Sequence, residues 1–318
     1  MKIKKTLLLA ILLILQFATQ VNAQILSNST EITITKNWSQ ELGGWTYPIY
    51  ISVPSNTVPD LGFPVCILLH GYGGNGEDML NTWKNTLATH VCVAVSGYLK
   101  CWNIDSEESK APDVEMMNDL IDSLQTYTNI NPNKIRVLGT SNGSALTNRV
   151  FIENKNTGVD IFCAIVSQLN ENQYHENDFY SPIGETGGSD IYGGYNIVSN
   201  PVTGRRYIGV SNNNDVIIPY KGGASVGVTF LPAETSIYTI AKSQGYSGAQ
   251  LTGTLIGGNV NRFSYLSGQV VLLNGGAKHW INSIQSDYIK NYFNNSSLVI
   301  GLDNDTSSNL KRYPNPTK

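Results

Sequence analysis

The chain of 318 residues has few charged side chains, only four histidines and only four cysteines. Charged residues make up 14% of it, the formal net charge is −3, and its lysines and arginines are scattered along the sequence. Binding of nucleic acid or of an anionic membrane surface through charge requires a basic cluster, so the sequence predicts neither partner. After residue 23 no apolar run approaches the roughly 20 residues that a membrane-spanning helix needs, which predicts a chain without a membrane span.

The few cysteines also limit the chemistry that we expect. Cys66, Cys92 and Cys163 lie inside apolar runs typical of buried strands, where a free thiol behaves as a small hydrophobic group. The fourth is Cys101. Although an exported chain could form disulfides, most of the four are expected to be free. No spacing of Cys and His resembles a zinc site, and we expect neither a metal nor a cofactor.

The N-terminus has the features of an export signal. Three lysines precede an apolar run at 7–15, and small residues end at Ala23. This pattern predicts a cleaved signal peptide over residues 1–23, because its apolar core is short for a membrane span. The mature protein is expected to be soluble and exported by secretion machinery, to the medium or the cell surface.

Short apolar runs alternate with segments of helical periodicity, such as the one at 113–127. The runs lie at 65–70, 91–96, 135–139, 161–167, 206–211 and 269–274. This alternation is typical of an α/β fold, with a mostly parallel sheet that helices cover on both faces. Before it, the segments 31–35 and 47–53 are predicted to form an antiparallel pair.

Two segments depart from this rhythm. Residues 168–205 are polar and rich in Gly, Asn and Tyr, and form either a functional loop over the site or a poorly ordered insertion. Near residue 294 the chain turns polar, which predicts a linker over 296–310. We therefore expect one catalytic domain over residues 24–295.

The motif Gly-x-Ser-x-Gly occurs twice, at 139–143 and at 223–227. It exposes a nucleophilic serine only where a strand turns sharply into a helix. Ser141 follows a strand-like run and precedes a helical pattern, whereas Ser225 stands between a loop and a strand-like segment. Ser141 is therefore the candidate nucleophile, and Ser225 is expected to be structural.

A serine hydroxyl needs a base to take its proton and an acid to hold that base. On an α/β sheet the acid and the histidine follow the serine in the chain, which leaves two histidines. His279 follows the last strand-like run in a Gly-rich loop, whereas His175 lies in the polar insertion and is expected to be a solvated loop residue. Asp215 follows a strand end and is the candidate acid, and Glu234 is expected to lie at a helix start.

An acyl transfer also needs two N–H groups that stabilise the developing oxyanion. One candidate is the N–H of Asn142, directly after the nucleophile. The other is that of Tyr72 in the loop "HGYGGNG", which follows an earlier strand-like run and which His70 is expected to brace. The loop lacks the Gly-Lys-Ser/Thr ending of a P-loop, so it does not predict nucleotide binding.

Four motifs now stand in the order of one known family: "LLHGYGGNGED", "KIRVLGTSNGSAL", "NNNDVIIPYKGG" and "NGGAKHW". Together with "CWN" and "APDVEMMNDLID", they resemble the secreted esterases of the polyhydroxybutyrate depolymerase and feruloyl esterase group, within the α/β-hydrolase superfamily. The resemblance covers about 65–280. It implies an α/β-hydrolase fold and assigns roles to the residues already chosen: nucleophile Ser141, acid Asp215, base His279, and oxyanion donors Tyr72 and Asn142.

The chain departs from the family pattern at three places. Ser144 stands where the family has a further glycine, Ser211 and Asn212 replace a His-Gly pair, and Trp280 follows the base immediately. These departures leave the implied triad complete and leave the substrate open. A second resemblance concerns the C-terminus, where "KRYPNPTK" at 311–318 is similar to the start of the sorting domain of type IX secretion substrates.

These features predict a secreted serine carboxylic ester hydrolase that works through an acyl-enzyme. Its ester substrate, possibly polymeric, would be a polysaccharide-linked feruloyl or acetyl ester or an aliphatic polyester such as polyhydroxybutyrate. Trp102, Trp280 and Tyr72, with the tyrosines of the insertion, form either an aromatic face that binds substrate or ordinary packing. Two alternatives stay open, a serine peptidase of the same fold and a non-catalytic carbohydrate-binding module on a degenerate hydrolase fold.

Overall fold

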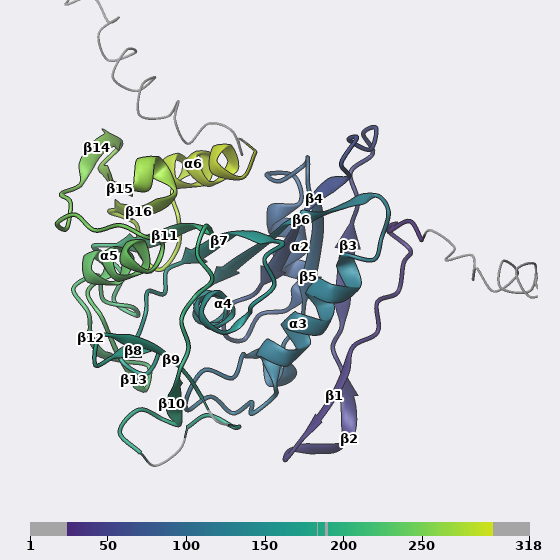
Figure 1. Cartoon of the computed structure of the whole chain (residues 1–318), viewed down its shortest axis with the longest axis horizontal. Helices are drawn as coiled ribbons and strands as arrows, with labels where there is room; N and C mark the ends of the chain where they lie inside the picture. The colour runs from purple at the N-terminus through teal and green to yellow at the C-terminus, as the bar shows by residue number, and fades with distance from the viewer. Residues whose placement is uncertain (1–23, 183, 188–189, 295–318) are drawn as a thin grey trace, which may run out of the picture.

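A computed structural model describes residues 24–294 except 183, 188 and 189. Its centre is a sheet of nine strands in the order β14-β15-β16-β11-β7-β6-β4-β5-β3 (Figure 1). The six inner strands run parallel, and antiparallel strands complete both edges. In chain order the nine are β3 Ile49–Ser52, β4 Phe63–Leu69, β5 Val91–Val95, β6 Ile130–Thr140, β7 Val159–Ile165, β11 Arg206–Asn212, β14 Thr254–Gly257, β15 Val260–Tyr265 and β16 Val270–Gly275. The six predicted apolar runs are the six parallel strands.

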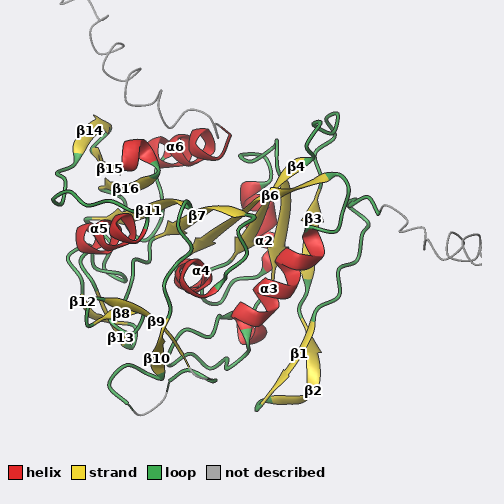
Figure 2. Cartoon of the chain, in the orientation of Figure 1, coloured by secondary structure: helices red, strands yellow, loops and turns green. Residues whose placement is uncertain are grey.

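Helices cover both faces of this sheet (Figure 2). The helices are α2 Gly76–Trp83, α3 Asp113–Leu124, α4 Asn142–Glu153, α5 Ala233–Ser243 and α6 Ser283–Asn294. Along β4, Val65, Ile67 and Leu69 belong to the core shared with α3, α4 and α5. Cys66 and Leu68 belong to the core shared with α2 and α6. Because both faces of each inner strand are buried, the strands are apolar throughout rather than alternating.

The predicted antiparallel pair between 31–35 and 47–53 is wrong. Instead β1 Thr35–Trp38 pairs with β2 Glu41–Thr46, and β3 pairs with β5 at the edge of the large sheet. Only two residues separate β1 from β2, so the nearer segment closes the hairpin first. The apolar residues of β3 are then free to cover the open edge of the sheet, whose backbone groups need partners.

The segment 168–205 forms a small antiparallel sheet beside α4 (Figure 1). Its strands are β8 Tyr174–His175, β9 Asp178–Pro182 and β10 Tyr195–Val198. A hairpin of β12 Gly223–Ser225 and β13 Val228–Phe230 meets this insertion at a bridge between Asn170 and Phe230. Two 3₁₀ turns, Tyr98–Lys100 and Leu266–Gly268, complete the described elements.

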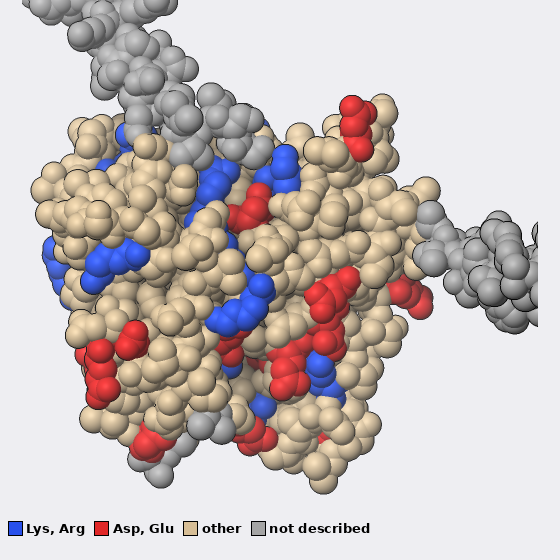
Figure 3. Space-filling view, in the orientation of Figure 1, with Lys and Arg blue, Asp and Glu red and all other residues tan. Residues whose placement is uncertain are grey.

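The surface and the cysteines agree with a sparingly charged, disulfide-free chain. On the face shown in Figure 3, acidic and basic side chains are interspersed and most of the surface is uncharged. All four cysteines are free and buried, which confirms that prediction. None of the helices within 24–294 combines the length and apolarity that crossing a membrane would require. The predicted signal peptide at 1–23, the linker at 296–310 and the sorting segment at 311–318 lie outside the described residues.

Candidate active site

Ser141 occupies the sharp turn between β6 and α4. Its backbone has φ 54° and ψ −119°, a conformation that is costly for a residue with a side chain, on the order of 1–3 kcal/mol. Bonds on both sides hold it, because its N–H donates to the Ile165 carbonyl (2.8 Å) and its carbonyl accepts from the Ala145 N–H (3.0 Å). The turn is therefore imposed by the sheet and the helix that it joins.

The two glycines of the motif allow this turn by their small size. A Cβ at Gly139 would lie 2.1 Å from the Gly143 carbonyl oxygen. A Cβ at Gly143 would lie 2.3 Å from the Leu69 carbonyl oxygen and 2.4 Å from that of His70. Both contacts are with backbone, which cannot move aside without shifting helix α4 or strand β4. Helix α4 can therefore approach β4 and β6 this closely only if both positions lack a side chain.

Asp215 and His279 reach Ser141 from the ends of two adjacent parallel strands. Asp215 follows β11 and His279 follows β16. The His279 Nε2 lies 2.8 Å from the Ser141 Oγ, and its Nδ1 lies 2.8 Å from the Asp215 Oδ2. The other carboxylate oxygen of Asp215 accepts the N–H groups of Ile217 (2.9 Å) and Ile218 (3.0 Å). The structure thus brings the three predicted residues into one continuous hydrogen-bonded chain.

Asn212, the last residue of β11, holds the loop that carries His279. Its Nδ2 donates to the carbonyls of Lys278 (3.0 Å) and Trp280 (2.5 Å), on either side of the histidine. Its Oδ1 accepts from the Gln285 Nε2 of helix α6 (2.8 Å). The sequence marked this position only as a departure from the family pattern, and its contacts could not be read without the fold.

The candidate oxyanion donors lie beside the serine. A Cβ on Gly71 would touch the Ser141 Cβ at 3.4 Å, so the loop that carries Tyr72 lies directly against the nucleophile turn. In the described part of the chain neither the Tyr72 N–H nor the Asn142 N–H has a hydrogen-bond acceptor. Both residues line the same pocket as Ser141, and their N–H groups are available to a ligand.

His70 and Trp102 hold the loop that carries Tyr72 in place by hydrogen bonds. The Nδ1 of His70 donates to the Gly71 carbonyl (2.7 Å), and its Nε2 accepts from the Gly97 N–H (2.9 Å). Burial lowers the pKa of His70, which favours the neutral ring that these two bonds require. The indole N–H of Trp102 donates to the His70 carbonyl (2.7 Å). The expectation that His70 braces the loop is confirmed.

Trp102 is not a substrate-binding residue, contrary to our expectation. Its side chain is fully buried, and it packs against the His70 ring at 4.8 Å between centroids. Of the two alternatives, a substrate-binding face or packing, Trp102 therefore takes the second and fills the core next to the loop that carries Tyr72. Trp280 does line the pocket and is 44% exposed.

The tyrosines of the insertion do not line the pocket of Ser141. Tyr195 is fully buried, and its hydroxyl donates to the Ile104 carbonyl (2.6 Å). Tyr180 and Tyr192 stack on opposite sides of His175 at 3.7 and 3.6 Å between ring centroids. His175 is therefore a packing residue of the insertion rather than a solvated loop residue.

Ser225 of the second motif does not join the hydrogen-bonded chain at Ser141, as expected. Ser225 belongs to the β12–β13 hairpin, and its hydroxyl donates to the Ile217 carbonyl (2.5 Å). Glu234 stands in the first turn of α5, the expected helix start, and accepts the Tyr220 hydroxyl (2.7 Å).

Ser141 opens into a pocket of about 860 Å³. Its wall is largely apolar and includes Met79, Ile104, Ala145, Ile217, Ile218, Val226, Val228, Phe230 and Trp280. Two carboxylates that sequence reasoning missed, Glu107 and Glu108, also line it. Glu107 accepts the side-chain amide of Asn142 (2.8 Å) and the N–H of Asp105 (2.7 Å), and burial raises its pKa. It ties the residue after the nucleophile to the loop at 101–107.

Comparisons with known proteins concern the fold. No profile of a known protein family matches the chain, and no curated protein matches it. The chain is similar to a solved carboxylesterase of Bacillus cereus, with a TM-score of 0.51 and 13% identity over 78% of this chain and 93% of that one. It is also similar to an acetyl xylan esterase from Aspergillus awamori, with a TM-score of 0.52 and 12% identity over 78% and 94%. The predicted α/β-hydrolase fold is thereby confirmed.

Proposed function

Because the chain has the α/β-hydrolase fold and joins Ser141, His279 and Asp215 by hydrogen bonds, we propose that it is a serine carboxylic ester hydrolase. The observation that carries the proposal is this chain of two bonds of 2.8 Å, beside two N–H groups that have no acceptor within the described residues. Two esterases among the similar structures support it as an analogy of fold.

The geometry supports an acyl-enzyme mechanism. His279 Nε2 takes the proton of the Ser141 hydroxyl as Oγ attacks the ester carbonyl, and the Asp215 carboxylate stabilises the resulting imidazolium. The N–H groups of Tyr72 and Asn142 donate to the negative oxygen, a contribution on the order of 3 kcal/mol for each donor. His279 then returns the proton to the leaving alcohol. Water repeats these steps and releases the acid.

The substrate that we propose is an extracellular ester, either a feruloyl or acetyl group on a polysaccharide or an aliphatic polyester such as polyhydroxybutyrate. The N-terminal export pattern motivates an extracellular location. The largely apolar wall of the pocket suits an acyl group, and Trp280 at its mouth suits a sugar ring or a phenolic ring.

The proposal is tested by hydrolysis of p-nitrophenyl esters, methyl ferulate, acetylated xylan and suspended polyhydroxybutyrate, each by wild type and by Ser141→Ala. Serine-dependent turnover of an ester is the expected result. Faster turnover of a matched peptide amide would instead identify a peptidase. Absence of turnover together with absence of labelling by a fluorophosphonate would contradict the proposal and favour a binding module.

A further inference from the structure

A second pocket adjoins the first on the other side of the β12–β13 hairpin. It measures about 570 Å³, within the size range of small-molecule sites. Val226 and Val228 of the hairpin line both pockets, and Asp105 lines the second pocket while its neighbours Ile104 and Ser106 line the first. A Cβ at Gly227 would lie 2.5 Å from the Ser106 hydroxyl, so hairpin and loop touch between the pockets. A chain-like ligand bound at Ser141 has this second pocket as its neighbour.

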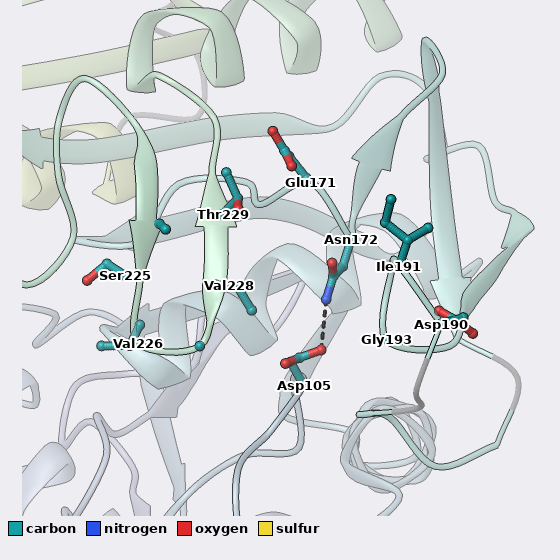
Figure 4. A pocket seen from close by; sticks show the side chains of 12 residues that line it. Asp105, Glu171, Asn172, Asp190, Ile191, Gly193, Ser225, Val226, Val228 and Thr229 are labelled. Atoms are coloured by element: carbon teal, nitrogen blue, oxygen red, sulfur yellow. Dashed lines mark hydrogen bonds between the residues drawn. The ribbon is translucent and has the colours of Figure 1, made fainter.

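The second pocket is fixed by a hydrogen-bonded pair, the buried Asn172 and the partly buried Asp105. Asn172 is only 8% exposed, and its Nδ2 donates to the Asp105 Oδ1 (2.8 Å), as Figure 4 shows. A Cβ at Gly193 would come within 2.2 Å of that carboxylate oxygen, so the backbone of the insertion packs directly on the pair. The Glu171 N–H donates to the Thr229 carbonyl (2.8 Å), which joins the insertion to β13.

The buried Asn172 has an acceptor that is left for a ligand. Among the described residues no group donates to the Asn172 Oδ1, and this atom is not among the fully enclosed ones. Asn172, Thr229 and Glu171 all line the second pocket, and in Figure 4 Asn172 points toward Asp105 while Glu171 points to the opposite side of the chain. A polar atom in an otherwise buried side chain gains most from a ligand that donates a hydrogen bond.

The available groups favour neutral hydroxyl donors. The lining residues of the second pocket in the described part of the chain include no Lys, Arg or His, so an anion would meet only repulsion. Asp190 already accepts hydrogen bonds from the N–H groups of Tyr192 and Gly194 and from the Asn196 amide. Its carboxylate therefore has partners without a bound cation. No three His, Cys, Asp or Glu side chains of the described residues stand close enough to hold a metal ion.

We propose that the second pocket is a subsite for sugar units of a carbohydrate chain whose ester group is cleaved at Ser141. The inference rests on the proposed function and selects the polysaccharide ester over the polyester. The repeating units of an aliphatic polyester have no hydroxyl donors, so they would cover Asn172, Thr229 and Glu171 without replacing the hydrogen bonds of these groups to water. A sugar presents several hydroxyl donors to the same three residues.

The test compares two substrates with the same acyl group, p-nitrophenyl acetate and an acetylated xylo-oligosaccharide. Asn172→Ala removes the free acceptor, and Thr229→Val removes a hydroxyl without changing the shape of the strand. For each, the ratio of kcat/KM for the oligosaccharide to kcat/KM for the small ester is expected to fall about tenfold, which is about 1.4 kcal/mol. Thr254→Val on β14, which lines neither pocket, is the matched control.

A second readout separates this inference from the proposed function. Isothermal titration of Ser141→Ala with xylo-, cello- and galacto-oligosaccharides is expected to give saturable binding of at least one, weakened about tenfold by Thr229→Val. The sugar subsite would be refuted, even with the esterase activity established, by either of two results. One is the same ratio of the two kcat/KM values in wild type and all variants, and the other is binding of none of these oligosaccharides. Binding of a lysine-rich peptide in their place would identify a cationic partner and overturn it too. Loss of turnover with oligosaccharide binding retained would refute the esterase alone.

Discussion

The two Gly-x-Ser-x-Gly segments share a motif and differ in everything around it. Ser141 stands between a buried parallel strand and a buried helix, with its hydroxyl 2.8 Å from His279. Ser225 stands in a two-stranded hairpin at the surface, with its hydroxyl on a carbonyl of the loop after Asp215. The same five-residue pattern thus gives a candidate nucleophile in one place and a loop support in the other.

The glycines of the two segments have different reasons to be glycine. Gly139 and Gly143 are needed because a Cβ would meet backbone oxygens within 2.4 Å. Gly223 and Gly227 have φ +109° and +88°, values that residues with a side chain rarely adopt. At the first motif glycine makes room for a packed helix, and at the second it permits a tight turn. The motif alone does not distinguish these two reasons.

The largest expected difference between the two segments is catalytic. Ser141→Ala should lower kcat on p-nitrophenyl acetate by about 10⁴-fold or more, because the attacking atom is lost. Ser225→Ala should stay within about threefold, since it loses one hydrogen bond of the acid loop. Initial rates and fluorophosphonate labelling measure both. Comparable losses of kcat in the two variants would show that the two serines do not differ in catalytic role.

The next difference is between a glycine that is needed because it lacks a side chain and a glycine that is needed because of its backbone conformation. Gly143→Ala forces a Cβ onto the Leu69 carbonyl, so α4 and Ser141 must shift and kcat should fall at least 100-fold. At Gly223 no atom lies within 4 Å of an added Cβ, and only backbone strain of about 1 kcal/mol is expected. Urea unfolding and steady-state kinetics check the pair. Full activity in Gly143→Ala would show that the close approach is not required.

A smaller effect should follow when the histidine loop is loosened. Asn212→Ala removes the two bonds to the carbonyls beside His279, each worth about 1 kcal/mol. We expect kcat to fall roughly tenfold with little change in KM, because the base is misplaced while the pocket is kept. Asn213→Ala, whose side chain bonds to Asn274 instead, is the control. A pure KM effect would argue against a positioning role.

The last difference concerns stability rather than catalysis, at a buried carboxyl group beside the loop at 101–107. Burial raises the pKa of Asp113 to about 7, whereas an unfolded aspartate titrates near about 3.9. Between these values the folded chain keeps a proton that the unfolded chain releases, so this group's contribution to stability is present below about pH 4 and is lost as the pH rises through 7. Asp113 accepts from the Tyr47 hydroxyl and the Asn103 N–H, beside the Trp102 loop.

Asp113→Asn removes this titration. The free energy of unfolding of wild type, relative to that of the variant, should therefore fall with rising pH, by at most about 1.4 kcal/mol per pH unit. Urea unfolding at a series of pH values between 4 and 7.5 measures it. Parallel curves for the two proteins would show that Asp113 does not titrate in this range.

Most of the fold could be predicted from local sequence patterns. Apolar runs such as that of β4 predict buried parallel strands because both faces of such strands are covered. The pairing of β1, β2 and β3 was predicted wrongly because weak, partly exposed strands choose partners by proximity and by open sheet edges. The substrate-binding role predicted for Trp102 was wrong for a similar reason, because the sequence alone does not show whether an aromatic side chain is buried or exposed.

The sequence by itself determined the kinds of groups and their order along the chain: a serine in a turn, then an acid, then a histidine, each after a strand. Short-range sterics and burial suffice for that, because strands and tight turns are local. The tertiary structure alone decided that Asn212 holds the histidine loop and that Asn172 and Asp105 line a second pocket. Asp105 and Asn172 are 67 positions apart in the chain, and only the packing of the sheet, the insertion and the hairpin brings such distant side chains within hydrogen-bond reach.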